Sequence, residues 1–419
     1  MSSALEAVGL IALVVAWPCF AREGLAQAPA APLALTGATI YPAPDQPAIR
    51  DGVVLLRDGR IAAVGRRSEV AVPAGTEAID CTGLTITSGF WNSHVHFGER
   101  KWEQAEKLPP AEAAEQLRQM LTGHGFTRVF DIGSPLKNTL ALRSRVAAGE
   151  VEGPGILTTG GIIWPKGGVP SLPLMEALGF ITEPQHEVAS PKEAAARARE
   201  LLDAGADGIK VYAATWFGEP VVMPKAVIAA AAAEAHARGK LLFAHPSNAA
   251  GLQAALAGGV DVVVHTAPSM KTWGDSLVAQ MVKAGVAVIP TLKLWRYETR
   301  SARLAFARPF AQAGVHELRA FHKGGGTVLF GTDVGYMLDY DTAEEFALMA
   351  EAGMDFPAIL ASLTTNPARR FGFGGRSGRV AAGMDGELVV LEGDPARDIG
   401  ALARVRYTVR QGRIVYRRP

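Results

Sequence analysis

Residues 89–97 read GFWNSHVHF, an apolar run of strand length that ends in two histidines one residue apart. Successive side chains of a β-strand point to opposite faces, so His94 and His96 are expected to point the same way. Such a pair alone does not separate a metal site from two solvent-facing histidines on an ordinary strand. The metal site is the favoured interpretation if further strands along the chain also end in ligand-type residues.

Seven more apolar, β-rich runs do follow, at residues 126–133, 155–163, 205–212, 241–247, 260–267, 286–292 and 327–333. Ala-rich helical patterns separate most of these runs, as at residues 109–123, 191–205, 224–239 and 342–353. Alternating strands and helices predict a parallel sheet covered by helices. Eight repeats favour a (β/α)8 TIM barrel over residues 89–374. A doubly wound open sheet is the alternative, but its usual glycine-rich phosphate turn is absent.

Both chain ends are rich in short β runs divided by turns, over residues 33–88 and 375–419. The first segment has the pattern of antiparallel strands and hairpins. Segments of this kind at opposite ends of a chain can pair into one small domain. The predicted fold class is therefore α/β, a (β/α)8 TIM barrel with a small β-sandwich domain built from both chain ends.

Composition narrows the class of protein. The 419 residues are 48% hydrophobic and 20% charged, with a net charge of +1, which is a globular composition. No long run of either charge suggests a nucleic-acid surface, so nucleic acid is not an expected partner. A homo-oligomer is compatible with the sequence, but no feature specifies one.

The first residues differ from the rest of the chain. Residues 7–21 form an apolar run of signal-peptide length, and Ala26 and Ala28 have the small-x-small spacing of a cleavage site. We predict a leader over residues 1–28, a periplasmic or secreted protein, and no stable membrane span after leader removal. A short membrane anchor is the alternative, because the leader begins without Lys or Arg. Cleavage would leave Cys81 as the one cysteine, which excludes an intramolecular disulfide and Cys-based zinc sites.

Ligand-type residues occur at the ends of several predicted strands, where TIM barrels place their chemistry. Four of the nine histidines lie there. A lysine in an apolar strand is also unfavourable unless it is neutralised or paired. The set predicts a metal site built from nitrogen and oxygen ligands, and it comprises His94, His96, Lys210, His245, His265 and Asp333.

This constellation, with GADGIKVY (205–212), GTD (331–333) and TTNPARRFG (364–372), resembles the amidohydrolase superfamily over nearly the whole chain. Locally it is most similar to the imidazolonepropionase-like and Xaa-Pro or Xaa-Arg dipeptidase branch. The resemblance implies two divalent metal ions, usually Zn²⁺. The first ion would be held by His94, His96 and Asp333, and the second by His245 and His265. Both would be bridged by a CO₂-derived carbamate on Lys210.

The resemblance also implies a metal-dependent hydrolase that cleaves an amide-type C–N bond through a metal-bridging hydroxide. Asp333 would take the proton of the attacking hydroxide and pass it to the leaving amine. Tyr212 shares strand parity with Lys210 and is a candidate donor to the oxyanion or a core tyrosine. An ordinary ion pair between Lys210 and Asp333 in a one-metal site is an alternative. So are a deaminase or a cyclic amide or lactone hydrolase on the same scaffold, and a non-catalytic binding protein.

Substrate features come from aromatic residues after the predicted strands. After Lys210 the chain reads YAATWFGEPVVMP (212–224), where the dipeptidase-like branch would have a glycine-rich turn. The long segment 164–191 is predicted to be a lid or substrate wall. Rings here favour a small aromatic or apolar substrate, although they can instead pack loops or an interface. The predicted substrate-binding residues are Trp164, Trp216, Trp295, Tyr297 and Arg296, the last as a carboxylate clamp or a surface residue.

Overall fold

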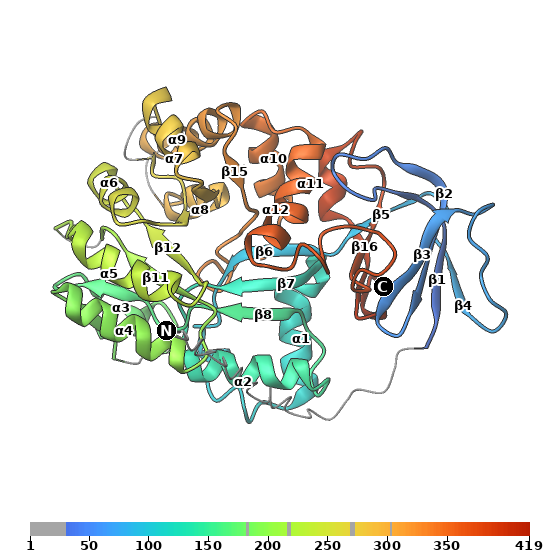
Figure 1. Ribbon diagram of the computed structural model, residues 1–419, viewed down its shortest axis with the longest axis horizontal. Coiled ribbons are helices and arrows are strands. Elements are labelled where there is room, and N and C mark those ends of the chain that lie inside the picture. The colour runs from blue at the N-terminus through green and yellow to red at the C-terminus, as the bar shows by residue number, and fades with distance from the viewer. Residues whose placement is uncertain (1–30, 182–183, 216–218, 269–272, 302–303) are drawn as a thin grey trace, which may run out of the picture.

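The computed structural model describes residues 31–181, 184–215, 219–268, 273–301 and 304–419. A body of helices and parallel strands lies beside a separate β-sheet (Figure 1). The predicted leader, residues 1–28, lies outside the described residues. Within the described ranges, no helix combines the length and the apolar character that crossing a membrane requires.

Two parallel sheets form the body, and all eight predicted runs contain a strand. The run 155–163 divides at Gly160 and Gly161 into two strands, and one further short strand, β10, was not predicted. The three-stranded sheet has the order β6 (Phe90–Val95), β7 (Phe126–Asp131) and β8 (Gly155–Thr158). The seven-stranded sheet has the order β10 (His186–Val188), β9 (Ile163–Pro165), β11 (Gly208–Tyr212), β12 (Leu241–His245), β13 (Val262–Val264), β14 (Ala287–Ile289) and β15 (Thr327–Val328).

Backbone hydrogen bonds join both edges of the three-stranded sheet to segments of the seven-stranded sheet. At one edge the Ser93 N–H of β6 donates to the Phe330 carbonyl, just after β15, at 2.7 Å. At the other edge the Asp207 N–H, just before β11, donates to the Thr158 carbonyl of β8 at 2.6 Å. The strands at both edges of the three-stranded sheet are therefore next to segments of the seven-stranded sheet.

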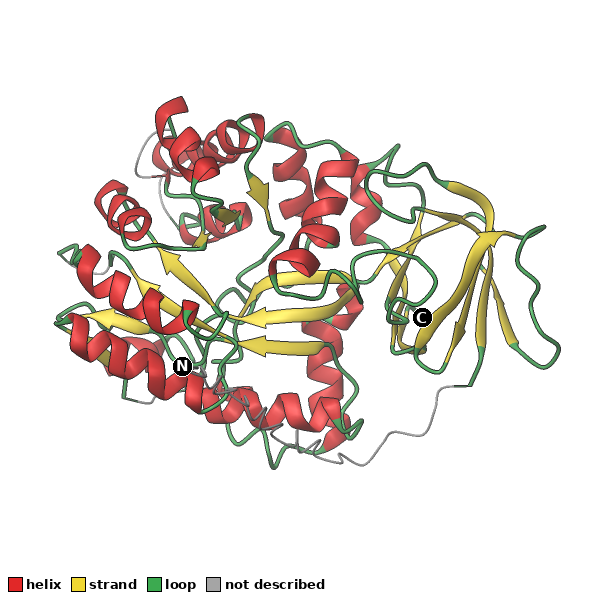
Figure 2. Cartoon of the chain, in the orientation of Figure 1, coloured by secondary structure: helices red, strands yellow, loops and turns green. Residues whose placement is uncertain are grey.

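Helices pack around these strands (Figure 2). Helix α4 illustrates the local cause, because Ser190 caps its first turn and Pro191 is its first residue. The helices are α1 (Pro110–Met120), α2 (Leu136–Ala147), α3 (Leu172–Ala177), α4 (Pro191–Asp203), α5 (Lys225–His236), α6 (Ala249–Ala257), α7 (Asp275–Lys283), α8 (Leu292–Glu298), α9 (Leu304–Lys323), α10 (Ala343–Glu351), α11 (Phe356–Leu363) and α12 (Thr365–Arg370). Helices α1, α4, α5 and α10 confirm the four helical patterns predicted from sequence.

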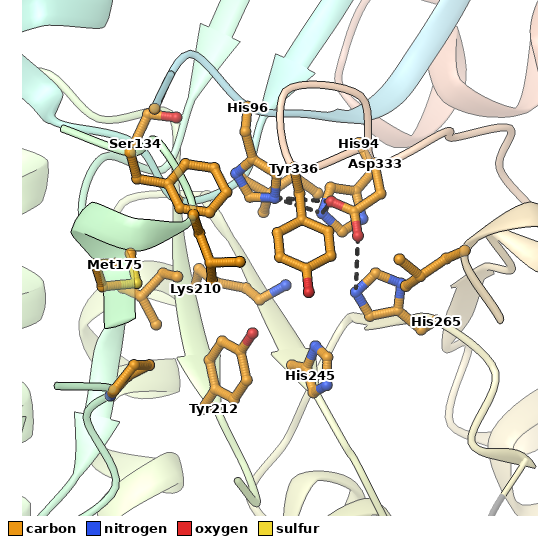
Figure 3. A pocket seen from close by; sticks show the side chains of 18 of the residues that line it. His94, His96, Ser134, Met175, Lys210, Tyr212, His245, His265, Asp333 and Tyr336 are labelled. Atoms are coloured by element: carbon orange, nitrogen blue, oxygen red, sulfur yellow. Dashed lines mark hydrogen bonds and ion pairs between the residues drawn. The ribbon is translucent and has the colours of Figure 1, made fainter. Parts of the chain in front are cut away.

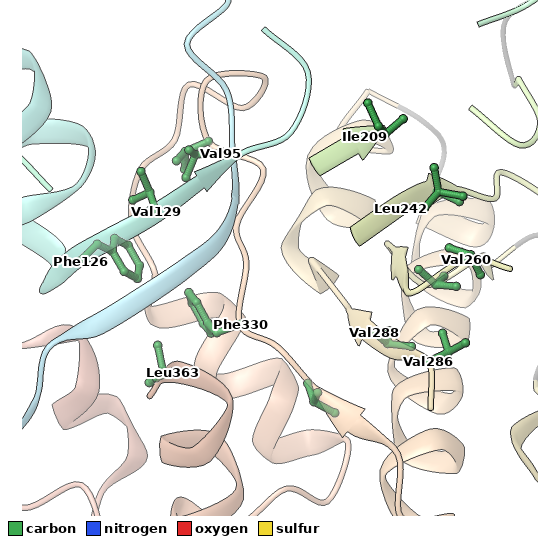
Figure 4. Close-up of a cluster of buried hydrophobic side chains, with 14 of the residues drawn as sticks. Val95, Phe126, Val129, Ile209, Leu242, Val260, Val286, Val288, Phe330 and Leu363 are labelled. Atoms are coloured by element: carbon green, nitrogen blue, oxygen red, sulfur yellow. The ribbon is translucent and has the colours of Figure 1, made fainter. Parts of the chain in front are cut away.

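The main core lies between the strands and the surrounding helices (Figure 4). Phe126 and Val129 of β7 are buried with Phe330 and with Leu363 of α11. Full burial of a side chain of this size contributes about 1.5–3 kcal/mol. This packing fixes the strands, and hence the residues at their ends, against the helical layer.

Strands from both chain ends share one sheet of eight strands, with β5 and β16 antiparallel where the ends meet. The antiparallel strands predicted for residues 33–88 are confirmed for β1, β2 and β3. The prediction was wrong for β4 and β5, which run parallel to β1 because segment 67–76 carries the chain back before β4 begins. The strands form one bonded sheet with its own core: β1 (Leu33–Ile40), β2 (Ile49–Arg57), β3 (Arg60–Arg66), β4 (Glu77–Asp80), β5 (Leu84–Ser88), β16 (Leu388–Glu392), β17 (Val405–Arg410) and β18 (Arg413–Arg417).

Candidate metal centre and substrate cavity

The six predicted ligand residues come from the carboxyl ends of five strands and meet around one space (Figure 3). They all line a cavity of about 440 Å³. Most are buried, and His96 is the most exposed at 16% of its side-chain area. The structure thus brings together residues that are up to 239 positions apart in the chain, namely His94, His96, Lys210, His245, His265 and Asp333.

Three ligand atoms are especially close. Asp333 Oδ1 lies 3.2 Å from His94 Nε2 and 3.0 Å from His96 Nε2. The two imidazole nitrogens are 3.0 Å apart. Even so, Asp333 Oδ1 has no hydrogen-bond partner among the described residues, so its two contacts with the imidazoles do not have hydrogen-bond geometry. A buried carboxylate oxygen without a hydrogen bond, beside two imidazole nitrogens, is an arrangement that a divalent cation satisfies, so these three residues fit a metal ion.

The electrostatics of the imidazoles also suit metal binding. Burial lowers the pKa of His94, His245 and His265 well below 6.5, and neighbouring cationic groups lower it further. The rings are therefore neutral near pH 7, which is the form that coordinates a metal.

Lys210 is buried in β11, and burial lowers its pKa from 10.5 to about 7. The Asp333 carboxylate offsets part of this effect. A substantial fraction of the amine is consequently uncharged near neutral pH, which is unusual for a lysine.

Thr291 orients one of the ligands. The Nδ1 atom of His265 is 2.5 Å from Thr291 Oγ1, which leaves Nε2 facing Asp333, whose Oδ2 is 3.9 Å away. All three residues have positive φ angles, 74° for His265, 44° for Thr291 and 61° for Asp333. Such angles are uncommon for residues other than glycine, and backbone strain of this kind concentrates at functional sites.

Two further features of this region were not predicted from sequence. Asn92 Oδ1 accepts the backbone N–H groups of His94 and Thr332, each at 3.2 Å, and so ties β6 to the segment that carries Asp333. Gly335 has a φ of +96°, and a Cβ there would lie 1.9 Å from the His96 carbonyl oxygen. Local sequence patterns give no signal for either feature, because the partners are more than 200 residues apart in the chain.

Tyr212 lies in a stack of three rings. Its ring is 4.0 Å from Trp164 at 18° and 4.3 Å from His245 at 14°. Its hydroxyl points towards Lys210 (Figure 3). Burial, with a smaller effect of Asp333, raises the pKa of Tyr212, so the hydroxyl keeps its proton. The stack holds both the hydroxyl and the His245 ring in place.

The predicted substrate-binding residues divide into three groups. Trp164 and Trp295 line the cavity, and Trp295 donates to Thr266 Oγ1 at 2.7 Å. Arg296 and Tyr297 are not among the described lining residues, because Arg296 pairs with Glu344 at 2.7 Å and the Tyr297 ring covers Arg300 at 3.8 Å. Trp216 lies outside the described residues.

Segment 164–191, predicted to be a lid or wall, does contribute a wall. Helix α3 and the residues after it supply apolar lining side chains, and Glu298 and Tyr336 line the cavity from other segments. No role in the site was predicted for Glu298. The α3 segment supplies Met175, Leu178, Phe180 and Ile181.

Taken together, the structure is a parallel α/β fold with buried ligand-type residues in and after its strands, towards their carboxyl ends, which is where enzymes with parallel sheets place their active sites. Residues 85–415 match the model of the family described as Amidohydrolase family. The match covers most of the chain, so the protein belongs to the amidohydrolase family.

Individual relatives support this placement. A segment of 73 residues is 38% identical to an imidazolonepropionase of Methylobacterium nodulans, covering 17% of this chain and 18% of the relative. The match thus spans under a fifth of that protein's length. The fold is similar to a putative prolidase from Bifidobacterium longum, with a TM-score of 0.78, 24% identity and coverage of 93% and 95%. It is also similar to a Xaa-Pro dipeptidase with bound methionine, with a TM-score of 0.78, 22% identity and coverage of 92% and 100%.

Proposed function

We propose that this protein is a metal-dependent hydrolase that cleaves an amide-type C–N bond in a small apolar or aromatic substrate. The observation that carries the proposal is the convergence of His94, His96 and Asp333 at distances of 3.0–3.2 Å. We further propose that residues 89–374 form a closed (β/α)8 barrel, supported by the hydrogen bonds at both sheet edges. Residues 33–88 and 375–419 would form the accompanying β domain, with the predicted sandwich shape.

Two divalent ions, with zinc as the expected metal, are proposed to bind here. His94, His96 and Asp333 would hold one, and His245 and His265 the other. Lys210 would bridge them after its uncharged nitrogen adds to the carbon of CO₂ and releases a proton, which leaves an anionic carbamate with two oxygen ligands. Bound together, the ions would lower the pKa of a water and polarise the substrate carbonyl.

The remaining steps fall to side chains of the chain itself. Asp333 is proposed to accept the proton of the attacking water and deliver it to the departing amine. The Tyr212 hydroxyl, protonated and held by the ring stack, would donate to the oxygen on which negative charge develops. Thr291 would keep His265 in the orientation that presents Nε2.

The cavity disfavours a free carboxylate on the acyl group. Lys210 is the one Lys or Arg among the described lining residues, and it belongs to the proposed metal centre. Arg296, the predicted carboxylate clamp, is already paired with Glu344. Hydrolysis of a cyclic amide is a second candidate, which the local sequence similarity to an imidazolonepropionase favours.

A substrate panel tests the proposal. Zinc-supplemented protein would be assayed with neutral aryl amides, N-acyl amino acids, dipeptides and cyclic amides, beside the Lys210→Ala variant. We expect turnover of aryl amides to exceed that of dipeptides and to fall at least about 100-fold in the variant. Equal activity of the variant, or no turnover by wild type of any C–N bond, would contradict the proposal.

Export is proposed on separate grounds, the leader-like residues 1–28. Expression of the full chain in a bacterial host, followed by fractionation and N-terminal sequencing, tests this. A mature chain in the periplasmic fraction that starts near residue 29 is expected. A full-length chain confined to the cytoplasm would contradict it.

A further inference from the structure

A carboxylate without a cationic partner faces the substrate cavity. Glu298 is the last residue of α8 and lines the same cavity as the proposed metal ligands. It forms no close ion pair with any described residue, although the charge of Arg300 acts on it from a longer distance, and its Oε1 accepts a hydrogen bond from the Tyr336 hydroxyl at 2.8 Å. The nearby guanidinium of Arg300 is held by the ring of Tyr297, 3.8 Å away, and by the Tyr297 carbonyl.

Tyr336 extends the acceptor surface of Glu298 into the cavity. Because its proton is donated to Glu298, the Tyr336 oxygen has lone pairs left for a ligand. This hydroxyl points into the space between Tyr212 and His265 (Figure 3). The carboxylate and the phenol oxygen together make an acceptor pair on the cavity wall, beside the six ligand residues.

Aromatic rings line the same cavity as this acceptor pair. The Phe180 ring stacks on Tyr336 with centroids 5.9 Å apart and an angle of 7°. The Trp295 ring meets Phe310 edge to face at 5.8 Å, and both line the cavity. Rings arranged around an acceptor are a favourable environment for a positively charged nitrogen.

We propose that Glu298 and Tyr336 are specificity-determining residues that bind a positively charged nitrogen on the substrate. The preferred substrates would be small amides with an ammonium or alkylammonium group. The amide part of this statement rests on the proposed function. The charge preference rests on the wall itself, which presents an unpaired carboxylate and aromatic rings.

Burial also raises the pKa of the Glu298 carboxyl, and the Asp333 charge raises it further, whereas the Tyr336 hydrogen bond and the Arg300 charge oppose these effects. A bound cation would favour the charged carboxylate in the same way as Arg300 does. A cation would therefore gain an attraction here that a neutral group of the same shape lacks.

Matched substrates test the charge preference. Three anilides of equal size would carry a trimethylammonium, a tert-butyl or a carboxylate group at the far end of the acyl chain. Zinc-loaded wild type is expected to show a kcat/KM about 10–100-fold higher for the trimethylammonium compound than for its tert-butyl isostere. The carboxylate compound is expected to be the poorest of the three.

The variant Glu298→Gln keeps the size of the side chain and removes its charge. It should abolish the preference while changing kcat/KM for the tert-butyl compound less than about 3-fold. Tyr336→Phe should reduce the preference as well. Asp394→Asn is the matched control, because Asp394 accepts a hydrogen bond of 2.7 Å from the Tyr41 hydroxyl beside the eight-stranded sheet. This variant should leave the preference unchanged.

Binding of benzyltrimethylammonium to zinc-loaded protein, measured by calorimetry, separates this proposal from the proposed function. Saturable binding that Glu298→Gln weakens about 10-fold or more supports the cation site even if no amide is cleaved. Three results would overturn it: absence of binding, equal loss for both isosteres in Glu298→Gln, or preference for the carboxylate compound.

Discussion

Replacing Lys210 with methionine is expected to stabilise the metal-free protein. The lysine is buried in β11, with 2% of its area exposed, and burial lowers its pKa from 10.5 to about 7. Methionine is of similar length, has no charge to desolvate and fits an irregular apolar space. Without metal, the wild-type residue is therefore a source of instability.

The magnitude follows from the difference between the two pKa values, 10.5 − 7 or about 3.5 units. At 1.36 kcal/mol per unit, the upper bound is about 5 kcal/mol of unfolding free energy. The folded-state pKa is the lower one, so between pH 7 and pH 10.5 the unfolded chain binds more protons and wild-type stability rises with pH. The advantage of the variant should be largest at pH 7 and below, and should decline towards pH 10.

Urea unfolding in the presence of a chelator, at pH 7 and pH 9.5, measures the effect. The variant should be more stable by a few kcal/mol at the lower pH and by less at the higher pH. Lys293→Met is the matched control, since this buried lysine pairs with Asp339 at 2.9 Å and donates to the Asp341 carbonyl at 2.6 Å. It should be destabilising by about 1–3 kcal/mol. Destabilisation of Lys210→Met at both pH values would refute the reasoning.

Three further changes test other parts of the structure. Gly335→Ala should abolish zinc binding and turnover, since a Cβ would lie 1.9 Å from the His96 carbonyl oxygen at a φ of +96°; wild-type zinc content would contradict this. Thr291→Val should weaken zinc affinity about 10–100-fold in a competitive chelator titration, because His265 loses its orienting contact; unchanged affinity would count against that role. Burial raises the pKa of Glu317 from 4.5 to about 8, so the wild-type protein loses stability as the pH rises from 4.5 to 8. In urea titrations, the unfolding free energy of Glu317→Gln should therefore exceed that of wild type by about 2–5 kcal/mol at pH 8 and equal it at pH 4. A variant advantage independent of pH would exclude this explanation.

Residues at the strand ends could be located from sequence because their signals are local. Alternation of strands and helices indicated a parallel sheet, and each ligand-type residue followed an apolar run. His94, His96 and Asp333 accordingly meet in the structure as the pattern indicated. The same reasoning found Trp164 and Trp295 on the cavity wall.

Contacts between distant segments could not be found this way. Arg296 lies beside aromatic residues in the sequence, but its helix turns it to Glu344 instead of the cavity. Glu298 is two residues further along the same helix and faces the cavity, a difference that depends on how α8 is rotated. The direction of β4 in the eight-stranded sheet likewise depends on the path of segment 67–76.

Elemental analysis of purified, zinc-supplemented protein measures whether the six side chains in and after the parallel strands hold a pair of divalent ions, as proposed. We expect about two zinc ions per chain for wild type and a clear loss in Lys210→Ala. A content near zero in wild type would contradict it.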